Sequence, residues 1–119
     1  MHATPPAPSF LAKVAGVEVI DVKRRSDFSV DIDGVVAAVR EHKATLVFLP
    51  SPNNPTGTIL PNADVEKLLQ ENCLVVVDEA YADFCDTTAL DLFATHNNLI
   101  ICRTFSKWYG TGTPSTFIS

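Results

Sequence analysis

Reactive polar side chains follow three apolar runs of the sequence, close to the point where each run ends. The runs cover residues 45–49, 74–77 and 99–102. The side chains that follow them are an amide at Asn54, a carboxylate at Asp78, a phenol at Tyr81, hydroxyls at Thr104 and Ser106, and an amine at Lys107. If the runs are parallel strands, their loops meet at the carboxyl edge of one sheet, where open α/β sheets bind ligands. The set suits a charged aromatic cofactor that is held by a covalent bond to the lysine.

Lys107 is the sharpest candidate, although a lone lysine is ordinarily solvated. It follows the third apolar run closely, and Phe105, Trp108 and Tyr109 surround it with apolar surface. Burial lowers the pKa of a lysine and makes its amine available as a nucleophile.

The other candidates also have ordinary interpretations when each is taken singly. Asp78 could cap a helix, Tyr81 could pack in the core, and Asn54 could be a turn residue. Thr104 and Ser106 offer hydroxyl donors that would suit a phosphate group. The combination at one sheet edge favours a binding site over these separate structural roles.

The elements that must position these residues alternate between helix and strand. In chain order we expect a helix that ends at Gly16, a strand over 17–22, a helix over 32–42, a strand over 45–49, a helix that begins near Pro61, a strand over 74–77, a helix near 87–95 and a strand over 98–102. Asp31 is expected to cap the second helix, with Val35 and Val39 on its apolar face. The alternation predicts an α/β fold with a mostly parallel sheet and flanking helices.

Composition narrows the function classes. At 119 residues, with 46% hydrophobic and 19% charged residues, the chain fits one globular domain. The net charge of -5 argues against a nucleic-acid partner. The three cysteines lack metal-ligand spacing, so we expect neither a metal site nor a disulfide scaffold. No apolar run approaches the roughly 20 residues that span a bilayer, so no membrane partner is expected.

Three strings carry a family resemblance. They are Ser51–Gly57 (SPNNPTG), Val77–Tyr81 (VDEAY) and Arg103–Lys107 (RTFSK). In this order and spacing they resemble the fold-type I pyridoxal-phosphate aminotransferases, most closely the histidinol-phosphate aminotransferase family. The resemblance implies a partial large domain of that fold over residues 9–110. A flexible arm over 1–8 is expected to precede it, and a tail over 111–119 does not match.

The resemblance implies a role for each candidate. Lys107 would form the internal aldimine with pyridoxal 5′-phosphate and move a proton during the reaction. Asp78 would keep the pyridinium nitrogen protonated. The remaining four would hydrogen-bond to the cofactor, Asn54 and Tyr81 at the phenolic oxygen and Thr104 and Ser106 at the phosphate.

The implied activity is transamination between a small-molecule amino donor, favoured as histidinol phosphate in histidine biosynthesis, and a keto acid. Full-length relatives are homodimeric. The match ends after Gly110, and Ser115 stands where the family has an arginine that grips the cofactor phosphate. We therefore interpret the chain as a truncated or partial member that transaminates poorly alone. A threonine-phosphate decarboxylase and a non-catalytic remnant stay open as alternatives. A cytoplasmic location is expected, or a plastid one if the true N-terminus is missing.

Overall fold

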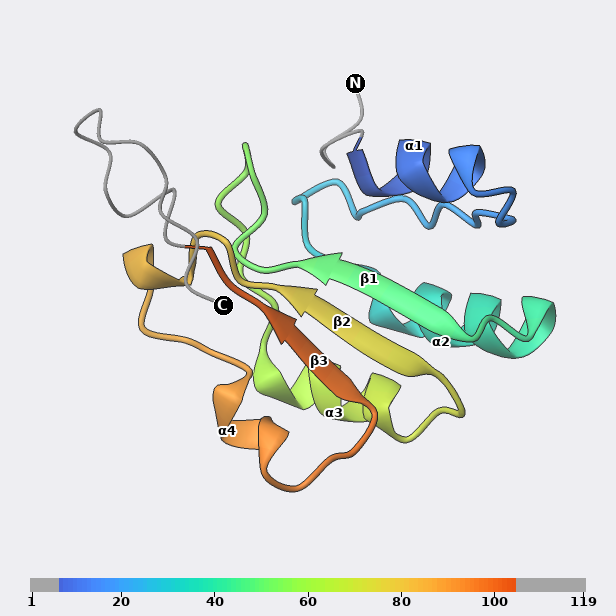
Figure 1. The fold of residues 1–119 in the computed structure, drawn as a ribbon. Coiled ribbons are helices and arrows are strands. Elements are labelled where there is room, and N and C mark those ends of the chain that lie inside the picture. Colours follow the sequence, from blue (N-terminus) through green and yellow to red (C-terminus); the bar gives the residue numbers. More distant parts are fainter. Residues whose placement is uncertain (1–6, 105–119) are drawn as a thin grey trace.

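The computed structural model of the protein describes residues 7–104, which build a parallel sheet with helices beside it (Figure 1). The strands are β1 (Leu46–Pro50), β2 (Leu74–Asp78) and β3 (Leu99–Cys102), and they lie side by side in that order. Both pairs of neighbours are parallel. β2 is the central strand, and Val75 and Val77 are almost fully buried. The predicted parallel α/β fold is therefore confirmed.

Two helices cover one face of this sheet. They are α2 (Ile32–His42) and α3 (Asn62–Leu69), which pack against each other, and α3 also contacts β2. Asp31 caps α2 as expected, because its carboxylate accepts a hydrogen bond from the Gly34 N–H. In α3 the apolar stripe lies in the core, where Leu68 has no exposed surface. The apolar core therefore lies between this face of the sheet and the two helices.

The connection from β2 to β3 contains two short helical segments. A 3₁₀ helix, η1 (Ala82–Phe84), is separated from the end of β2 by three residues, and α4 (Leu90–Phe93) packs against β3. α4 lies within the helix expected near 87–95 but is shorter, and η1 was not expected. η1 matters for the site because Tyr81 immediately precedes it.

The strand expected over 17–22 is wrong. Within residues 7–104 this segment pairs with no strand, and Val17 and Ile20 are exposed. The segment runs from α1 (Ala7–Val14) to the loop before α2 (Figure 1). β-propensity expresses packing on a pleated surface, so apolar alternation without a neighbouring strand does not produce one. The flexible arm was expected to extend to residue 8, but α1 already begins at Ala7. Gly16 lies just after the end of α1 and has a φ of 74°.

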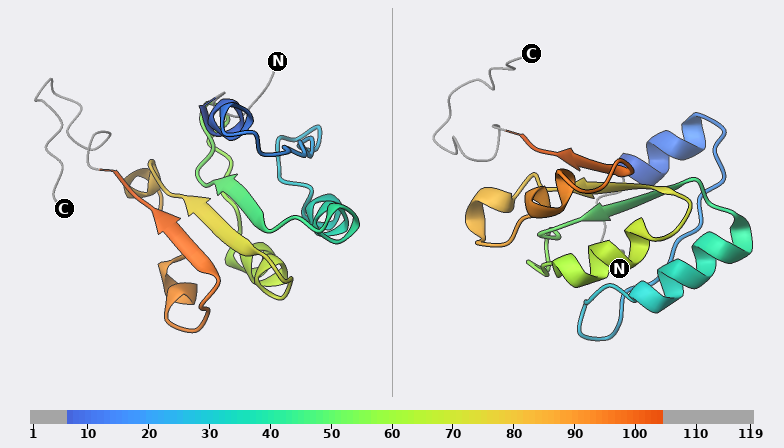
Figure 2. Two further views of the ribbon diagram at one scale, coloured as in Figure 1. Left: turned by 45° about the vertical axis from the view of Figure 1, so that its right-hand side comes forward. Right: turned by 90° about the horizontal axis from the view of Figure 1, so that it is seen from below.

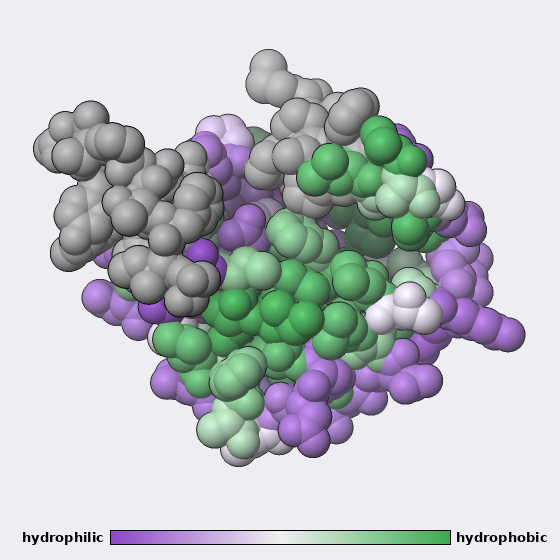
Figure 3. Space-filling model, in the orientation of Figure 1, coloured by the Kyte–Doolittle hydropathy of each residue, from purple (hydrophilic) through white to green (hydrophobic). Residues whose placement is uncertain are grey.

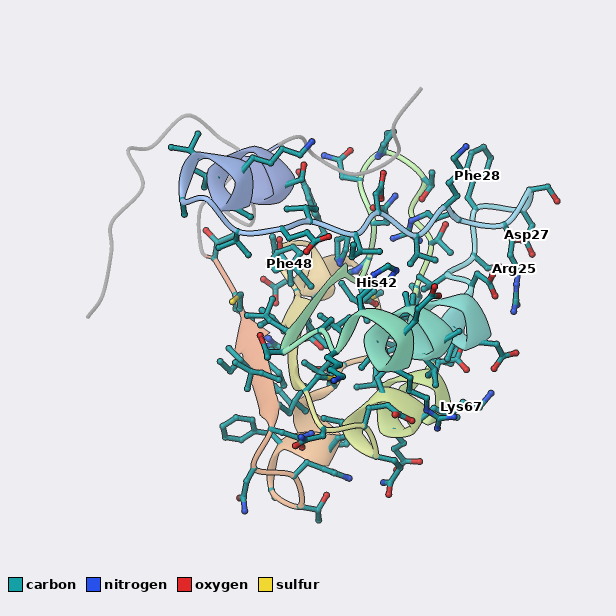
Figure 4. All side chains as sticks on the ribbon, turned by 90° about the vertical axis from the view of Figure 1, so that its right-hand side faces the viewer. Arg25, Asp27, Phe28, His42, Phe48 and Lys67 are labelled. Carbon is teal, nitrogen blue, oxygen red and sulfur yellow. The ribbon has the colours of Figure 1, made fainter. Side chains whose placement is uncertain are left out.

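Within residues 7–104, the second face of the sheet is only partly covered. α1 lies on this side, opposite α2 and α3 (Figure 2, right). Phe48 points from β1 toward the same side (Figure 4). Apolar side chains gather over the strands there (Figure 3), and Leu46 and Ile100 remain 52% and 42% exposed. An apolar sheet face of this kind is unusual for a monomeric soluble protein.

Candidate functional site

Asp78 ends β2 at the carboxyl edge of the sheet. In the strand register it pairs with Pro50 on one side and Cys102 on the other, so the three strand ends are level. Side chains alternate along a strand, which places Asp78 on the same face as Val76, opposite the α2–α3 core. Its Oδ1 accepts a hydrogen bond of 3.0 Å from the Ala80 N–H, and the residue is half-buried. The carboxylate is thus held at the sheet edge and remains partly accessible.

The loop that follows β1, residues 51–60, is attached firmly to this edge. The Ser51 N–H donates to the Asp78 carbonyl at 2.9 Å, which continues the pairing of β1 with β2 by one residue. The Ser51 side chain is buried, and its Oγ accepts a hydrogen bond of 2.9 Å from the Leu60 N–H. Ser51 therefore closes the base of the loop.

Asn53 organises the inside of the same loop. It is only 2% exposed, its Nδ2 donates to Thr56 Oγ1 at 2.8 Å, and its N–H donates to the Thr58 carbonyl at 2.9 Å. Gly57 has a φ of 69°, a conformation that glycine adopts without strain, and its N–H donates to the Asn53 carbonyl. With the base and interior fixed, the neighbouring Asn54 is left exposed.

Asn54 and Tyr81 meet although they come from different loops. The Asn54 Nδ2 donates a hydrogen bond of 2.8 Å to the Tyr81 hydroxyl, across 27 residues of sequence. A cavity of about 310 Å³ lies beside the pair, and Pro52, Ile59 and Cys85 contribute to its lining. The structure thus brings two of the predicted residues into direct contact, next to the strand end that carries a third, Asp78.

The remaining candidates lie at or beyond the end of the described residues. Thr104 is half-buried and follows β3 by two residues. Ser106 and Lys107 lie outside the described residues, as does Ser115.

Sequence reasoning missed an ion pair at this edge. Glu79 is 3% exposed, and its Oε2 lies 2.8 Å from Arg103 Nη2. A signal was present in the sequence, because Glu79 comes two residues after the run 74–77 and Arg103 directly follows the run 99–102. Without the register of β2 against β3 nothing in the sequence paired them.

The shifted carboxyl and thiol groups among the described residues lie away from the site. A hydrogen bond from Arg40 holds the pKa of Glu71 below its ordinary value, and this pair links α2 to the end of α3. A hydrogen bond from Ser29 lowers the pKa of Asp27, in the loop before α2. Burial raises the pKa of the Cys73 thiol. None of these groups lines the cavity beside Asn54 and Tyr81.

No group of three or more His, Cys, Asp or Glu residues within 7–104 could hold a metal ion. No helix in that range is both long and apolar enough to cross a membrane.

Comparison with known proteins places this arrangement in a family. Residues 9–112 match the model of the family Aminotransferase class I and II. The chain is 47% identical over 102 residues to a histidinol-phosphate aminotransferase of Roseiflexus castenholzii, covering 86% of this chain and 28% of the relative. It is 50% identical over 101 residues to that of Thermobifida fusca, covering 82% of this chain and again 28% of the relative.

A solved structure gives the same result. The histidinol-phosphate aminotransferase of Sinorhizobium meliloti, in complex with pyridoxal-5′-phosphate, superposes with a TM-score of 0.79 at 33% identity. The superposition covers 92% of this chain and 31% of that chain. This chain thus spans less than a third of the length of these relatives. The family model, the sequence identity and the structural superposition all point to the same family, and the chain belongs to the class I and II aminotransferases.

Proposed function

We propose that the chain carries the cofactor-binding part of a pyridoxal-phosphate-dependent aminotransferase, with histidinol phosphate as amino donor and a keto acid as acceptor. The observation that carries this proposal is the 2.8 Å contact between Asn54 and Tyr81 beside the strand end at Asp78. The names of the relatives at up to 50% identity support the donor. Homodimeric assembly and a cytoplasmic or plastid location belong to the same proposal.

The donor and acceptor groups present fit pyridoxal phosphate. The cofactor's ring has a phenolic oxygen that accepts hydrogen bonds and a ring nitrogen that binds a proton. Asn54 and Tyr81 offer an amide and a hydroxyl that lie 2.8 Å apart, so both groups are close enough to reach one ligand oxygen. Asp78 offers the carboxylate that a protonated nitrogen needs.

The described residues would bind and orient the ring. Asp78 would accept a hydrogen bond from the ring nitrogen and hold the proton there by its negative charge. Asn54 and Tyr81 would donate to the phenolic oxygen and fix the ring's rotation. When bound, the cofactor supplies an electron sink for a substrate carbanion. The contribution of these three residues is to keep that sink charged and aligned.

Lys107 would supply the amine that binds the cofactor aldehyde. The Lys107 amine would also be the group that takes a proton from the substrate α-carbon and gives it back during the reaction. Thr104 and Ser106 would donate their hydroxyls to the phosphate. Ser115, at the position where the family carries an arginine, cannot provide a bidentate cationic contact. We therefore expect weaker cofactor binding than in the relatives.

Trapping of the covalent lysine adduct tests the proposal. Purified protein is mixed with pyridoxal phosphate, reduced with borohydride, digested and analysed by mass spectrometry. We expect the cofactor's mass on Lys107, and loss of this adduct in Lys107→Ala. Lys67→Ala is the matched control, because Lys67 is an exposed lysine on α3 and should leave the adduct unchanged.

The same experiment discriminates against a non-catalytic remnant. A folded parent protein that shows no adduct at Lys107, or equal labelling of all lysines, contradicts the proposal. The amino donor is then tested by incubating the protein with histidinol phosphate and a keto acid and measuring the keto product that forms.

A further inference from the structure

The most deeply buried carboxylate among the described residues is not the predicted Asp78 but its neighbour. Glu79 is 3% exposed, whereas Asp78 is half-buried. The Glu79 N–H donates to the Cys102 carbonyl at 2.8 Å and so extends the pairing of β2 with β3 past the end of both strands. A carboxylate this far from water requires charged and polar partners.

Two other segments of the chain supply those partners. Arg103 donates through Nε and Nη2 to Glu79 Oε2, at 3.0 and 2.8 Å. The Thr88 hydroxyl lies 2.8 Å from the same oxygen, and the Ala89 N–H donates to Oε1. Arg103 Nη2 also donates to Thr88 Oγ1 at 2.8 Å, so the three side chains form a closed network. Glu79 thereby joins the end of β2, the end of β3 and the loop before α4.

This network lies directly beside the candidate site. Glu79 is bonded covalently to Asp78, and Arg103 is bonded covalently to Thr104 and lies four residues before Lys107. The pair therefore ties together the two segments that would carry the ring-nitrogen partner and the phosphate and lysine contacts. The Glu79 carboxylate is engaged by both Arg103 and Thr88.

We propose that the Glu79–Arg103 ion pair, closed by Thr88, is a positioning device that sets where the segment beginning at Thr104 leaves the sheet relative to Asp78. This inference rests on the proposed function. Covalent attachment at Lys107 and charge contact at Asp78 must act on one ring, so a small displacement between them costs reactivity steeply. The ion pair acts through its neighbours and does not touch the cofactor.

Variants of both partners test this, with a second ion pair of the chain as control. Glu79→Gln removes the charge at nearly constant size, and Arg103→Lys keeps the charge but loses the two-pronged contact. The control is Arg40→Gln, because Arg40 makes a similar two-pronged contact to Glu71, at 3.0 and 2.7 Å, between α2 and the end of α3. All variants are compared at equal concentration of folded protein.

The first measurement is the yield of the borohydride-reduced adduct on Lys107 at limiting pyridoxal phosphate, across a range of pH. Glu79→Gln and Arg103→Lys should lower the yield by about tenfold and shift its pH profile, the size expected for a misplaced reacting group. Arg40→Gln should leave both within about twofold of the parent, the scale of an exposed ion pair. Equal profiles in Glu79→Gln, Arg103→Lys and parent would overturn the inference while leaving the proposed function intact.

The second measurement needs no cofactor. Hydrogen–deuterium exchange of the amides of residues 99–104 should quicken severalfold in Glu79→Gln and Arg103→Lys but not in Arg40→Gln. Unchanged exchange would overturn the inference independently of any binding. A parent that forms no adduct at Lys107 would reject the proposed function and this inference together.

Discussion

Replacement of Ser51 by alanine should destabilise the protein through a hydrogen bond at the base of the loop that presents Asn54. Ser51 is 8% exposed and Leu60 is 4% exposed, and the Ser51 hydroxyl accepts from the Leu60 N–H at 2.9 Å. In Ser51→Ala this N–H stays buried without its acceptor. An orphaned buried donor costs about 1–3 kcal/mol. The backbone bond from Ser51 to Asp78 is not affected by the change.

Urea unfolding followed by far-UV circular dichroism measures this cost. A loss of about 2 kcal/mol, with a slope of about 1–2 kcal/mol per molar urea, lowers the midpoint by about 1–2 M. Ser29→Ala is the matched control, because Ser29 also makes a side-chain hydrogen bond, to Asp27 at 2.6 Å, but on the exposed surface. There water can replace the lost partner, so the midpoint should barely move.

The comparison has a clear refuting result. If Ser51→Ala and Ser29→Ala shift the midpoint equally little, the hydroxyl of Ser51 does not hold the loop and its burial has no energetic consequence. If the cost appears as expected, the loop behind Asn54 is stabilised by its own internal bonds. Its geometry would then precede any ligand rather than follow from one.

Two further predictions concern the α2–α3 ion pair and the second face of the sheet. The pKa of Glu71 is lowered in the folded protein, so its contribution to stability is present above the unfolded pKa of about 4.5 and is lost as the pH falls through the folded pKa. The difference in unfolding free energy between parent and Glu71→Gln should therefore shrink between pH 7 and pH 3. A difference that stays constant over this range would contradict the prediction. Ile100→Thr should raise the concentration at which light scattering detects association, because Ile100 is 42% exposed on the apolar face and threonine keeps the β-propensity. The stability of Ile100→Thr should change by no more than about 0.5 kcal/mol, as for surface positions, and unaltered association would show that this face does not drive it.

Local sequence patterns were enough to predict those elements that depend on residues close together in the chain. The core-facing stripe of α3, the cap of α2 by Asp31 and the apolar runs of the strands all depend on neighbours close in sequence. The same patterning failed over 17–22, where apolar alternation found no strand to pair with. Pairing is a long-range property, and a segment does not encode the presence of its partner.

That polar residues follow three parallel strands and gather at one sheet edge can be predicted from the chain alone, because alternation of helix and strand implies parallel strands. Which of these residues touch depends on the folded structure. The Asn54–Tyr81 contact spans 27 residues and depends on the internal bonds of the first loop and on the backbone turn after Asp78. The pairing of Glu79 with Arg103 depends on the register that sets Asp78 level with Cys102. A shift of one residue would turn each side chain to the opposite face, and this choice is made by packing in the core rather than by either segment alone.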